Sequence, residues 1–259
     1  MFNLKALLFD SDGVVVDSEM ARDEIMRNIL LGFGVKYDRD VTKPKLSGKA
    51  EKEMIDIIIA DYKLNIGPQE LSEKRKEALN DLYQNKLDFV PGFMGLYNTL
   101  KETYCVYSDY RYKAKIAIVS GCEPSLFEGV DKRLKISELV SKPDMHNEFD
   151  IPKPYIFLSN KMGVKSKPFP DVFLSALQCM NVLSEDSVVF EDAPNGIAAS
   201  LRAGVPKTVA ITRTFSEELL RKETIKLSGM VGSVINGKVL FIPDYSSSSI
   251  EKVIDYINK

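Results

Sequence analysis

Near its start the chain reads Leu7-Leu8-Phe9-Asp10-Ser11-Asp12-Gly13-Val14-Val15-Val16-Asp17-Ser18-Glu19, and this stretch decides the fold. The apolar run from Leu4 to Phe9, bounded by chain-breaking residues, is typical of a fully buried strand of a parallel sheet. Open α/β sheets bind their ligands at the carboxyl ends of such strands, which is where Asp10 and Asp12 lie. We therefore predict an α/β protein whose functional site begins at these two carboxylates.

The two aspartates are separated by one residue, so in an extended segment both side chains point the same way. Carboxylates held so close repel each other unless a cation lies between them or one of them keeps a proton. Gly13 lets the backbone turn and lets main-chain atoms approach a bound group. An acidic turn without a function is the alternative, and this motif by itself leaves both interpretations open.

The composition narrows the classes of function. The chain has 259 residues, enough for one large domain or two unequal ones, with a net charge of −2 and a pI near 5.7. This charge gives no reason to expect nucleic acid or an anionic membrane as a partner. No stretch has the pattern of a transmembrane helix or of a secretory signal.

The few cysteines and the single histidine exclude further classes of function. The three cysteines, Cys105, Cys122 and Cys179, are too few and too scattered for a disulfide framework or a cysteine-based metal site. The single histidine, His146, lies in a polar stretch, which makes catalysis by a histidine base improbable. We expect a cytoplasmic protein.

Residues 19–87 show helical periodicity with no strand between the helices. Val90-Pro91-Gly92 ends this region, and an alternation of strands and helices begins there. We predict an all-helical insert that is entered just after the aspartate pair. Its predicted helices span residues 20–33, 51–62 and 71–87, with a short loop around Pro44, Ser47 and Gly48.

From Phe93 onward the alternation predicts a parallel sheet that is covered by helices on both faces. The tail differs, because Asn236-Gly237 favours a type I′ turn and so predicts a hairpin between residues 231–235 and 238–242. The predicted strands span 116–119, 155–158, 188–190 and 209–211, and the predicted helices span 93–100, 169–180, 195–203 and 246–257, with another that starts near Pro124.

Polar residues follow three further predicted strands or precede helices. Ser120 ends the second strand, Lys167 stands before a helix in Lys167-Pro168-Phe169-Pro170-Asp171, and Glu191-Asp192 closes the strand Val188-Val189-Phe190. A hydroxyl at such a junction can hold a phosphoryl oxygen, and paired carboxylates are natural Mg²⁺ ligands. Taken singly, each also has an ordinary explanation as a helix cap or a solvated charge.

Together, and in this order, the four motifs resemble those of the haloacid dehalogenase-like superfamily. The closest likeness is to its β-phosphoglucomutase-type branch of sugar-phosphate phosphatases and mutases, and it spans residues 4 to about 212. The helical insert sits where that branch carries its helical cap. The matching stretches are Phe9 to Glu19, Val119-Ser120, Lys167 to Phe173, and Phe190 to Ala199 with Ala203-Gly204-Val205.

The resemblance implies a fold and its division into domains. We expect an α/β protein with a three-layer Rossmann-like parallel-sheet core and an α-helical cap domain. The core is expected to comprise residues 1–17 and 89–259, and the cap residues 18–88.

The resemblance also implies roles for the core motifs. Asp10 is the expected nucleophile, which forms an aspartyl-phosphate, and Asp12 the expected general acid and then base. General chemistry agrees, because phosphoryl transfer depends on positioning and on neutralising charge. The resemblance further implies that Mg²⁺ is bound by Asp10, by the backbone carbonyl of Asp12 and by Asp192, while Glu191 steadies the water shell of the ion. It also implies that Ser120 and Lys167 bind the phosphoryl oxygens, next to Gly121.

The sequence departs from the usual pattern of the superfamily in three places. Ser120-Gly121-Cys122 lacks the asparagine or second serine that often follows the phosphate-binding hydroxyl. The stretch from Tyr104 to Lys113 carries four tyrosines, and the stretch from Ser137 to Pro154 is long and polar. Loops of such length in a compact domain are usually functional or mobile.

Specificity is expected to lie in the cap, because the core motifs contact only the phosphoryl group. The one predicted non-helical stretch with a glycine flanked by polar groups is Leu46-Ser47-Gly48-Lys49. We hypothesise that Ser47 or Lys49 contacts the substrate and that Glu19, which opens the first cap helix, lies beside the aspartate pair. A solvated turn is the alternative.

These observations predict a Mg²⁺-dependent phosphatase that hydrolyses a small phosphorylated metabolite, a sugar phosphate in the first instance, as a monomer or weak homodimer. A phosphomutase needs the same residues and is the nearest alternative. A non-catalytic binding protein on the same scaffold is a third interpretation, which the competent residues in all four motifs disfavour.

Overall fold

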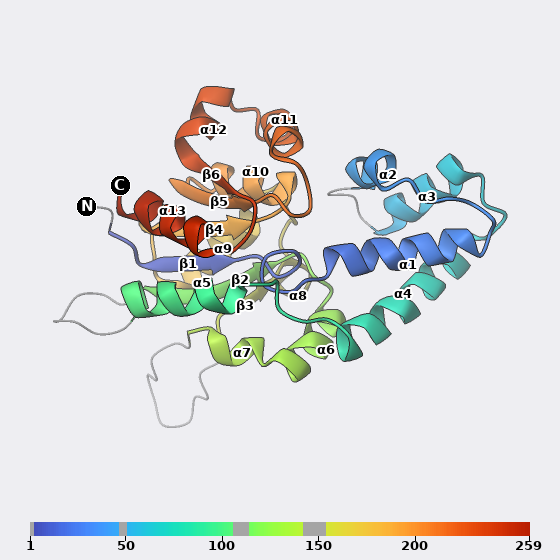
Figure 1. Cartoon of the computed structure of the whole chain (residues 1–259), viewed down its shortest axis with the longest axis horizontal. Coiled ribbons are helices and arrows are strands. Elements are labelled where there is room, and N and C mark those ends of the chain that lie inside the picture. Colours follow the sequence, from blue (N-terminus) through green and yellow to red (C-terminus); the bar gives the residue numbers. More distant parts are fainter. Residues whose placement is uncertain (1–2, 47–50, 106–113, 142–153) are drawn as a thin grey trace.

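A six-stranded parallel sheet forms the centre of the protein. The computed structural model describes residues 3–46, 51–105, 114–141 and 154–259, and its strands lie in the order β3-β2-β1-β4-β5-β6 (Figure 1). Every pairing between neighbouring strands of this sheet is parallel. The strands are β1 (Ala6–Phe9), β2 (Lys115–Ser120), β3 (Ile156–Leu158), β4 (Ser187–Glu191), β5 (Lys207–Ile211) and β6 (Val239–Ile242).

The first strand occupies the middle of the sheet and alternates between its two faces. Leu7 and Phe9 pack into one hydrophobic core, whereas Ala6 and Leu8 pack into the core on the opposite face. All four side chains are buried, as expected for a parallel strand that is covered on both sides. This arrangement confirms the α/β fold with three layers.

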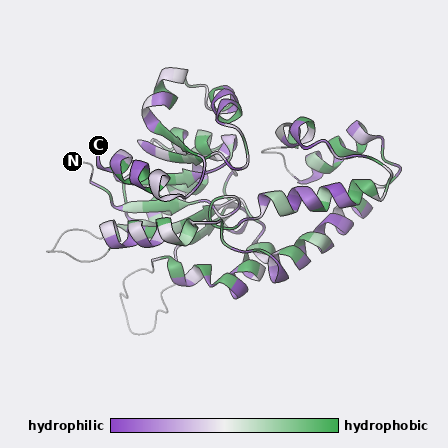
Figure 2. Cartoon of the chain, viewed as in Figure 1, coloured by the Kyte–Doolittle hydropathy of each residue, from purple (hydrophilic) through white to green (hydrophobic). Residues whose placement is uncertain are grey.

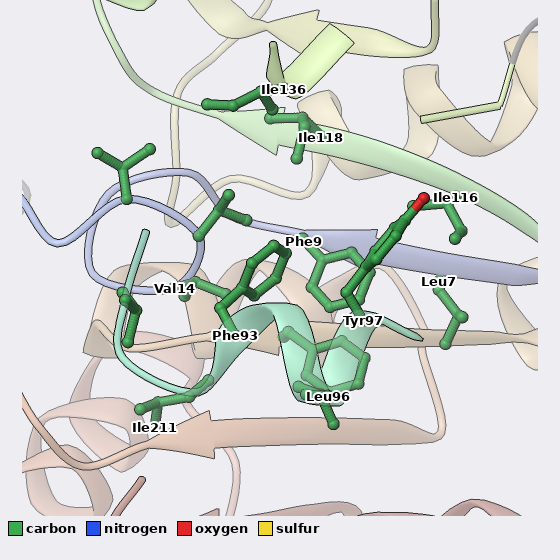
Figure 3. Packing of buried hydrophobic residues seen from close by; sticks show 14 of the residues in the cluster. Leu7, Phe9, Val14, Phe93, Leu96, Tyr97, Ile116, Ile118, Ile136 and Ile211 are labelled. Atoms are coloured by element: carbon green, nitrogen blue, oxygen red, sulfur yellow. The ribbon is translucent and has the colours of Figure 1, made fainter. Parts of the chain in front are cut away.

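Aromatic side chains fill the core on the first face, which the helices α5 (Phe93–Leu100) and α13 (Ser247–Asn258) cover. The ring of Phe9 stacks on Phe190 of β4, with the ring centroids 4.4 Å apart, and meets Phe93 edge-on at 5.8 Å. Figure 3 shows Phe93 projecting from α5 toward Phe9, and the ring of Tyr97 extending from the same helix toward Ile116. These contacts hold the carboxyl end of β1 in a fixed place.

The helices α9 (Asp171–Met180) and α10 (Pro194–Arg202) cover the second face. α10 also packs against α11 (Glu217–Ser228), which in turn packs against α12 (Gly232–Lys238). The remaining elements of the core are α6 (Pro124–Leu134), α7 (Ile136–Leu139), α8 (Ser159–Met162) and the short helices Lys101–Cys105 and Ser184–Asp186.

Four helices lie beyond the carboxyl end of β1, apart from the sheet (Figure 1). They share a small hydrophobic core that includes Leu30, Ile55, Ile58 and Leu71. Figure 2 shows apolar residues along the central strands, but mixed apolar and polar bands along the two longest of these helices. The helices are α1 (Glu19–Leu31), α2 (Arg39–Leu46), α3 (Glu51–Tyr62) and α4 (Pro68–Asn85).

Two expectations about local structure were wrong. Residues 231–242 form no hairpin, because Asn236 and Gly237 lie in α12 and the following β6 pairs in parallel with β5. Ile235 is buried between α10 and α11, and this burial outweighs the local preference for a turn. Of the loop predicted around Pro44, Ser47 and Gly48, Pro44 lies in α2, whereas Ser47 and Gly48 lie outside the described residues. The sequence did not predict α11. None of the described helices has the length and apolar character needed to cross a bilayer.

Leu96 tests the first core directly. It is fully buried, so replacing it with alanine in Leu96→Ala should reduce the free energy of unfolding by about 2–5 kcal/mol. The matched control is Leu183→Ala, because Leu183 is 62% exposed and its replacement should change stability by less than about 0.5 kcal/mol. Urea unfolding of both variants measures the difference, and similar losses in the two would contradict this packing.

Candidate active site

The polar residues singled out in the sequence converge at the carboxyl edge of the sheet. Phe9 of β1 lies opposite Ile118 of β2 and Phe190 of β4, so the residues that follow these strands are neighbours. The backbone N–H of Asp10 donates to the Phe190 carbonyl at 3.0 Å. The structure therefore brings the ends of three strands together at one place.

Lys167 connects these three strand ends. Its Nζ lies 2.6 Å from Asp10 Oδ1, 2.6 Å from Glu191 Oε1 and 2.9 Å from the Val119 carbonyl oxygen. The ammonium also lies 5.1 Å from the centre of the Phe173 ring. Lys167 is buried, and two ion pairs with carboxylates compensate for its removal from water.

Three carboxylates, Asp10, Glu191 and Asp192, form an acidic cluster in which one oxygen from each lies within 4.8 Å of the others. All three residues are buried. Burial raises the pKa of Asp10 to about 7, although Lys167 opposes this rise and Glu191 adds to it. Burial, with the charges of Glu19 and Glu191, raises the pKa of Asp192 well above its ordinary value.

This donor set fits a divalent cation. Lys167 supplies one positive charge against three carboxylates, so the cluster retains an excess of negative charge. Oxygen ligands are those that Mg²⁺ and Ca²⁺ prefer. A cation among them would favour the charged form of both aspartates and so offset the burial and the repulsion that raise their pKa values.

Thr214 and Gly13 lie close to one carboxylate oxygen of Asp192. Thr214 Oγ1 donates a hydrogen bond of 2.5 Å to Asp192 Oδ2. Gly13 has a φ of +77°, and a Cβ atom there would lie 2.0 Å from the same oxygen. The glycine of the first motif is thus required both by its backbone conformation and by the approach of Asp192. Gly13, Glu19 and Thr214 also line a small hollow at this place.

Asp12 points to partners different from those of Asp10. Its Oδ1 accepts a hydrogen bond from Ser18 Oγ at 2.6 Å and another from the Tyr83 hydroxyl. Arg22 lies 3.3 Å from Asp12 Oδ2 and donates to the Tyr83 oxygen at 3.2 Å. Burial raises the pKa of Tyr83 well above its ordinary value, so the phenol keeps its proton and acts as a donor to Asp12.

The other residues predicted for the site are Ser120, Gly121, Glu19, Ser47 and Lys49. Ser120 is buried and its Oγ accepts from the Cys122 backbone N–H at 3.1 Å, whereas Gly121 is exposed, with open space where a Cβ would be. Glu19 begins α1 and forms an ion pair with Lys43 at 2.8 Å. Ser47 and Lys49 lie outside the described residues. Most residues of the two long stretches, Tyr104 to Lys113 and Ser137 to Pro154, also lie outside the described residues.

Sequence reasoning missed three residues of this site: Arg22, Tyr83 and Thr214. Arg22 carries a detectable signal, because it stands one helical turn after Ser18 in the motif and must lie near Asp12. Tyr83 falls on the apolar face of the helix predicted over residues 71–87, but nothing in the sequence indicates that its hydroxyl reaches Asp12. Thr214 follows β5 in a stretch without a recognisable motif.

The fold and the site together define an α/β protein with a buried lysine–carboxylate cluster at the carboxyl edge of its sheet. The model of the haloacid dehalogenase-like hydrolases matches residues 4–204. The chain belongs to this family.

Individual comparisons agree with the family. The chain is similar to a phosphorylated carbohydrates phosphatase of Thermotoga maritima, with 22% identity over 83% of this chain and 88% of the relative. It is 27% identical to a β-phosphoglucomutase of Bacillus subtilis, over 78% of this chain and 81% of the relative. A haloacid dehalogenase-like protein of unknown function from Agrobacterium tumefaciens shares the fold, with a TM-score of 0.73, 17% identity and full coverage of both chains.

Gly196 offers a test of the cluster's packing. A Cβ there would lie 1.9 Å from Glu191 Oε1. Glu191 cannot yield freely, because it is held by Lys167 and accepts from the Asp192 N–H at 3.1 Å. Gly196→Ala should therefore displace Glu191 and lower the free energy of unfolding by about 3–5 kcal/mol, the usual effect of breaking a buried ion pair.

The matched control is Gly237→Ala, since Gly237 lies in α12 and a Cβ there has no neighbour within 4 Å. This change should be neutral or stabilising by up to about 1 kcal/mol, because alanine favours a helix. Thermal or urea unfolding measures both variants. A Gly196→Ala protein as stable as the wild type would show that Glu191 is not confined.

Proposed function

We propose that this chain is a Mg²⁺-dependent phosphomonoesterase that hydrolyses a small phosphorylated metabolite through an aspartyl-phosphate on Asp10. The observation that carries this proposal is the position of Asp10, which is buried at the carboxyl end of the central strand and held by Lys167 at 2.6 Å. A carboxylate fixed in this way beside a cation is suited to attack phosphorus. Membership of the family and the phosphatases among its relatives support the same chemistry.

In the first step, a carboxylate oxygen of Asp10 attacks phosphorus while the bond from phosphorus to the ester oxygen breaks. Asp12 gives its proton to the departing oxygen. In the second step, Asp12 takes a proton from water, and the water oxygen attacks phosphorus, which releases inorganic phosphate and restores the Asp10 carboxylate. One residue thus acts as acid and then as base, and such proton transfers contribute about 10²–10⁴-fold each.

The remaining motif residues bind the charge. Lys167, Ser120 and the backbone at Gly121 would hold phosphoryl oxygens. When bound, Mg²⁺ supplies positive charge that neutralises the phosphoryl group. Its proposed protein ligands are Asp10, the backbone carbonyl of Asp12 and Asp192, with Glu191 orienting the water shell.

We take residues 18–88 as the cap domain and residues 1–17 with 89–259 as the core. The two links between them run side by side. The Asp17 N–H donates to the Asp88 carbonyl at 2.9 Å, and Val16 and Phe89 form an antiparallel bridge. Paired links of this kind suit a hinge that closes over the site and excludes water.

Substrate choice is assigned to the cap. Glu19, at the start of α1, and the segment with Ser47 and Lys49 are the groups proposed to contact the substrate. A sugar phosphate is the proposed substrate class, because similar proteins include a phosphorylated carbohydrates phosphatase and a fructose-1-phosphate phosphatase. A cytoplasmic location and a monomer or weak homodimer stay predictions.

A phosphomutase is the second candidate, because one relative is a β-phosphoglucomutase. Such an enzyme keeps a bisphosphate intermediate bound while this intermediate reverses its orientation in the site. Conversion of a sugar 1-phosphate to the 6-phosphate, assayed with added sugar bisphosphate, separates it from a phosphatase that releases inorganic phosphate.

Asp10→Asn tests the nucleophile. The amide keeps the shape of the side chain but cannot form the acyl-phosphate, so phosphate release from p-nitrophenyl phosphate and from a panel of phosphorylated sugars should fall to background. The wild type should be active with Mg²⁺ and inactive in EDTA. Circular dichroism confirms that the variant is folded. Appreciable turnover by a folded Asp10→Asn protein would contradict covalent catalysis.

Tyr83→Phe tests the assignment of Asp12. Without the phenol the proposed acid loses a charge-assisted hydrogen bond, and kcat/KM for alkyl phosphates such as sugar phosphates should fall about 10-fold or more. The value for p-nitrophenyl phosphate should change little, because p-nitrophenolate departs without a proton. Equal losses with both ester classes would show that Tyr83 does not act through the acid.

A further inference from the structure

Thr214 lies between the acidic cluster and the cap. It is 4% exposed and stands in the segment between β5 and α11. Its hydroxyl donates to Asp192 Oδ2 at 2.5 Å, and its backbone carbonyl accepts a hydrogen bond from Arg39 of α2 at 2.7 Å. One residue therefore contacts a proposed metal ligand on one side and a cap helix on the other.

Arg39 is itself held by the cap. Its Nε lies 2.6 Å from Asp23 Oδ2, and Asp23 is a buried residue of α1. The same carboxylate oxygen contacts Lys43 at 2.8 Å, and the other oxygen accepts from the Tyr37 hydroxyl at 3.2 Å. The guanidinium of Arg39 is therefore anchored in the cap, while its Nη2 donates to the Thr214 carbonyl of the core.

The adjacent residue makes a second connection of the same segment. Arg213 lies 3.1 Å from Asp17, the residue at which the chain leaves the core for α1. Arg213 thus contacts the link to the cap, and the next residue, Thr214, contacts the cap itself. The Thr214 hydroxyl also donates a hydrogen bond to the carboxylate of Asp192. One short segment of the core thus contacts the link, the cap and Asp192 at once.

Carboxylates that bind metals are in general oriented by a hydrogen bond to a neighbouring group, and loss of that bond weakens the metal about 10–100-fold. Thr214 is in the right place for this task, because its hydroxyl binds one of the two carboxylate oxygens of Asp192. Gly13 also approaches this oxygen closely, but it has no side chain to offer.

We propose that Thr214 is a positioning residue for Asp192 and that Arg39 holds Thr214 in place, so that metal binding and cap docking strengthen each other. The proposal rests on the metal site of the proposed function. Thermodynamic reciprocity follows: if docking of the cap improves metal affinity, metal binding stabilises the docked cap by the same factor.

Replacement of the Thr214 hydroxyl tests the first link. Thr214→Val keeps the shape of the side chain and removes the hydrogen bond, whereas Thr214→Ser keeps the hydroxyl. The measurement is the dissociation constant of Mn²⁺, followed by electron paramagnetic resonance without substrate. We expect a rise of about 10–100-fold for Thr214→Val and a value near wild type for Thr214→Ser.

Two results would overturn this link: a wild-type dissociation constant in a folded Thr214→Val protein, or equal weakening in Thr214→Ser. Asp192→Asn is the control for the site itself and should lose most Mn²⁺ binding. A wild-type protein that binds no Mn²⁺ would refute the metal site of the proposed function, a failure that these variants distinguish from failure of Thr214 alone.

Arg39→Gln tests the second link, and the sign of its effect is informative. If Arg39 acted only as a positive charge, its removal would tighten cation binding. If it acts by holding Thr214, its removal should weaken Mn²⁺ binding in the wild type and have no further effect in Thr214→Val. Tighter binding, no change in the wild type, or equal weakening in both backgrounds would overturn the link to the cap.

Discussion

The ammonium group of Lys167 is the interaction on which the rest of the site depends. It lies 2.6 Å from each of two buried carboxylates, Asp10 and Glu191. Buried carboxylates without a cation would be strongly destabilising, so the lysine makes it possible to hold them at the ends of two neighbouring strands. The aromatic core under Phe9 then fixes the strand that carries Asp10.

The two aspartates of the first motif serve different parts of the molecule. Asp10 faces the core cluster. Asp12 instead accepts hydrogen bonds from Ser18, just before α1, and from Tyr83 of α4, with Arg22 of α1 beside it. On the core side, the thiol of Cys122 also bonds to Asp12. The proposed nucleophile thus has its ion-pair partner Lys167 in the core, whereas the proposed acid is bound largely by α1, α4 and the residue before α1. Under the proposed function, this division would let a movement of the cap alter the surroundings of Asp12 without displacing Asp10.

Much of this could be predicted from the sequence, for a physical reason. Buried parallel strands are short apolar runs, so Leu4 to Phe9 and Val188 to Phe190 are recognisable, and the polar residues after them must meet at one edge. What failed was decided by distant contacts. Asn236-Gly237 favours a turn locally, yet burial of Ile235 keeps it helical, and Tyr83 reaches Asp12 across 71 residues of sequence.

The covalent role of Asp10 is the central claim, and trapping the intermediate tests it most directly. A reaction with a sugar phosphate, stopped with acid within one turnover and digested, is analysed by mass spectrometry. The account predicts the mass of one phosphoryl group on the peptide that contains Asp10, and none on that peptide in Asp10→Asn. Phosphate on another residue, or turnover without any phosphorylated peptide, would contradict it.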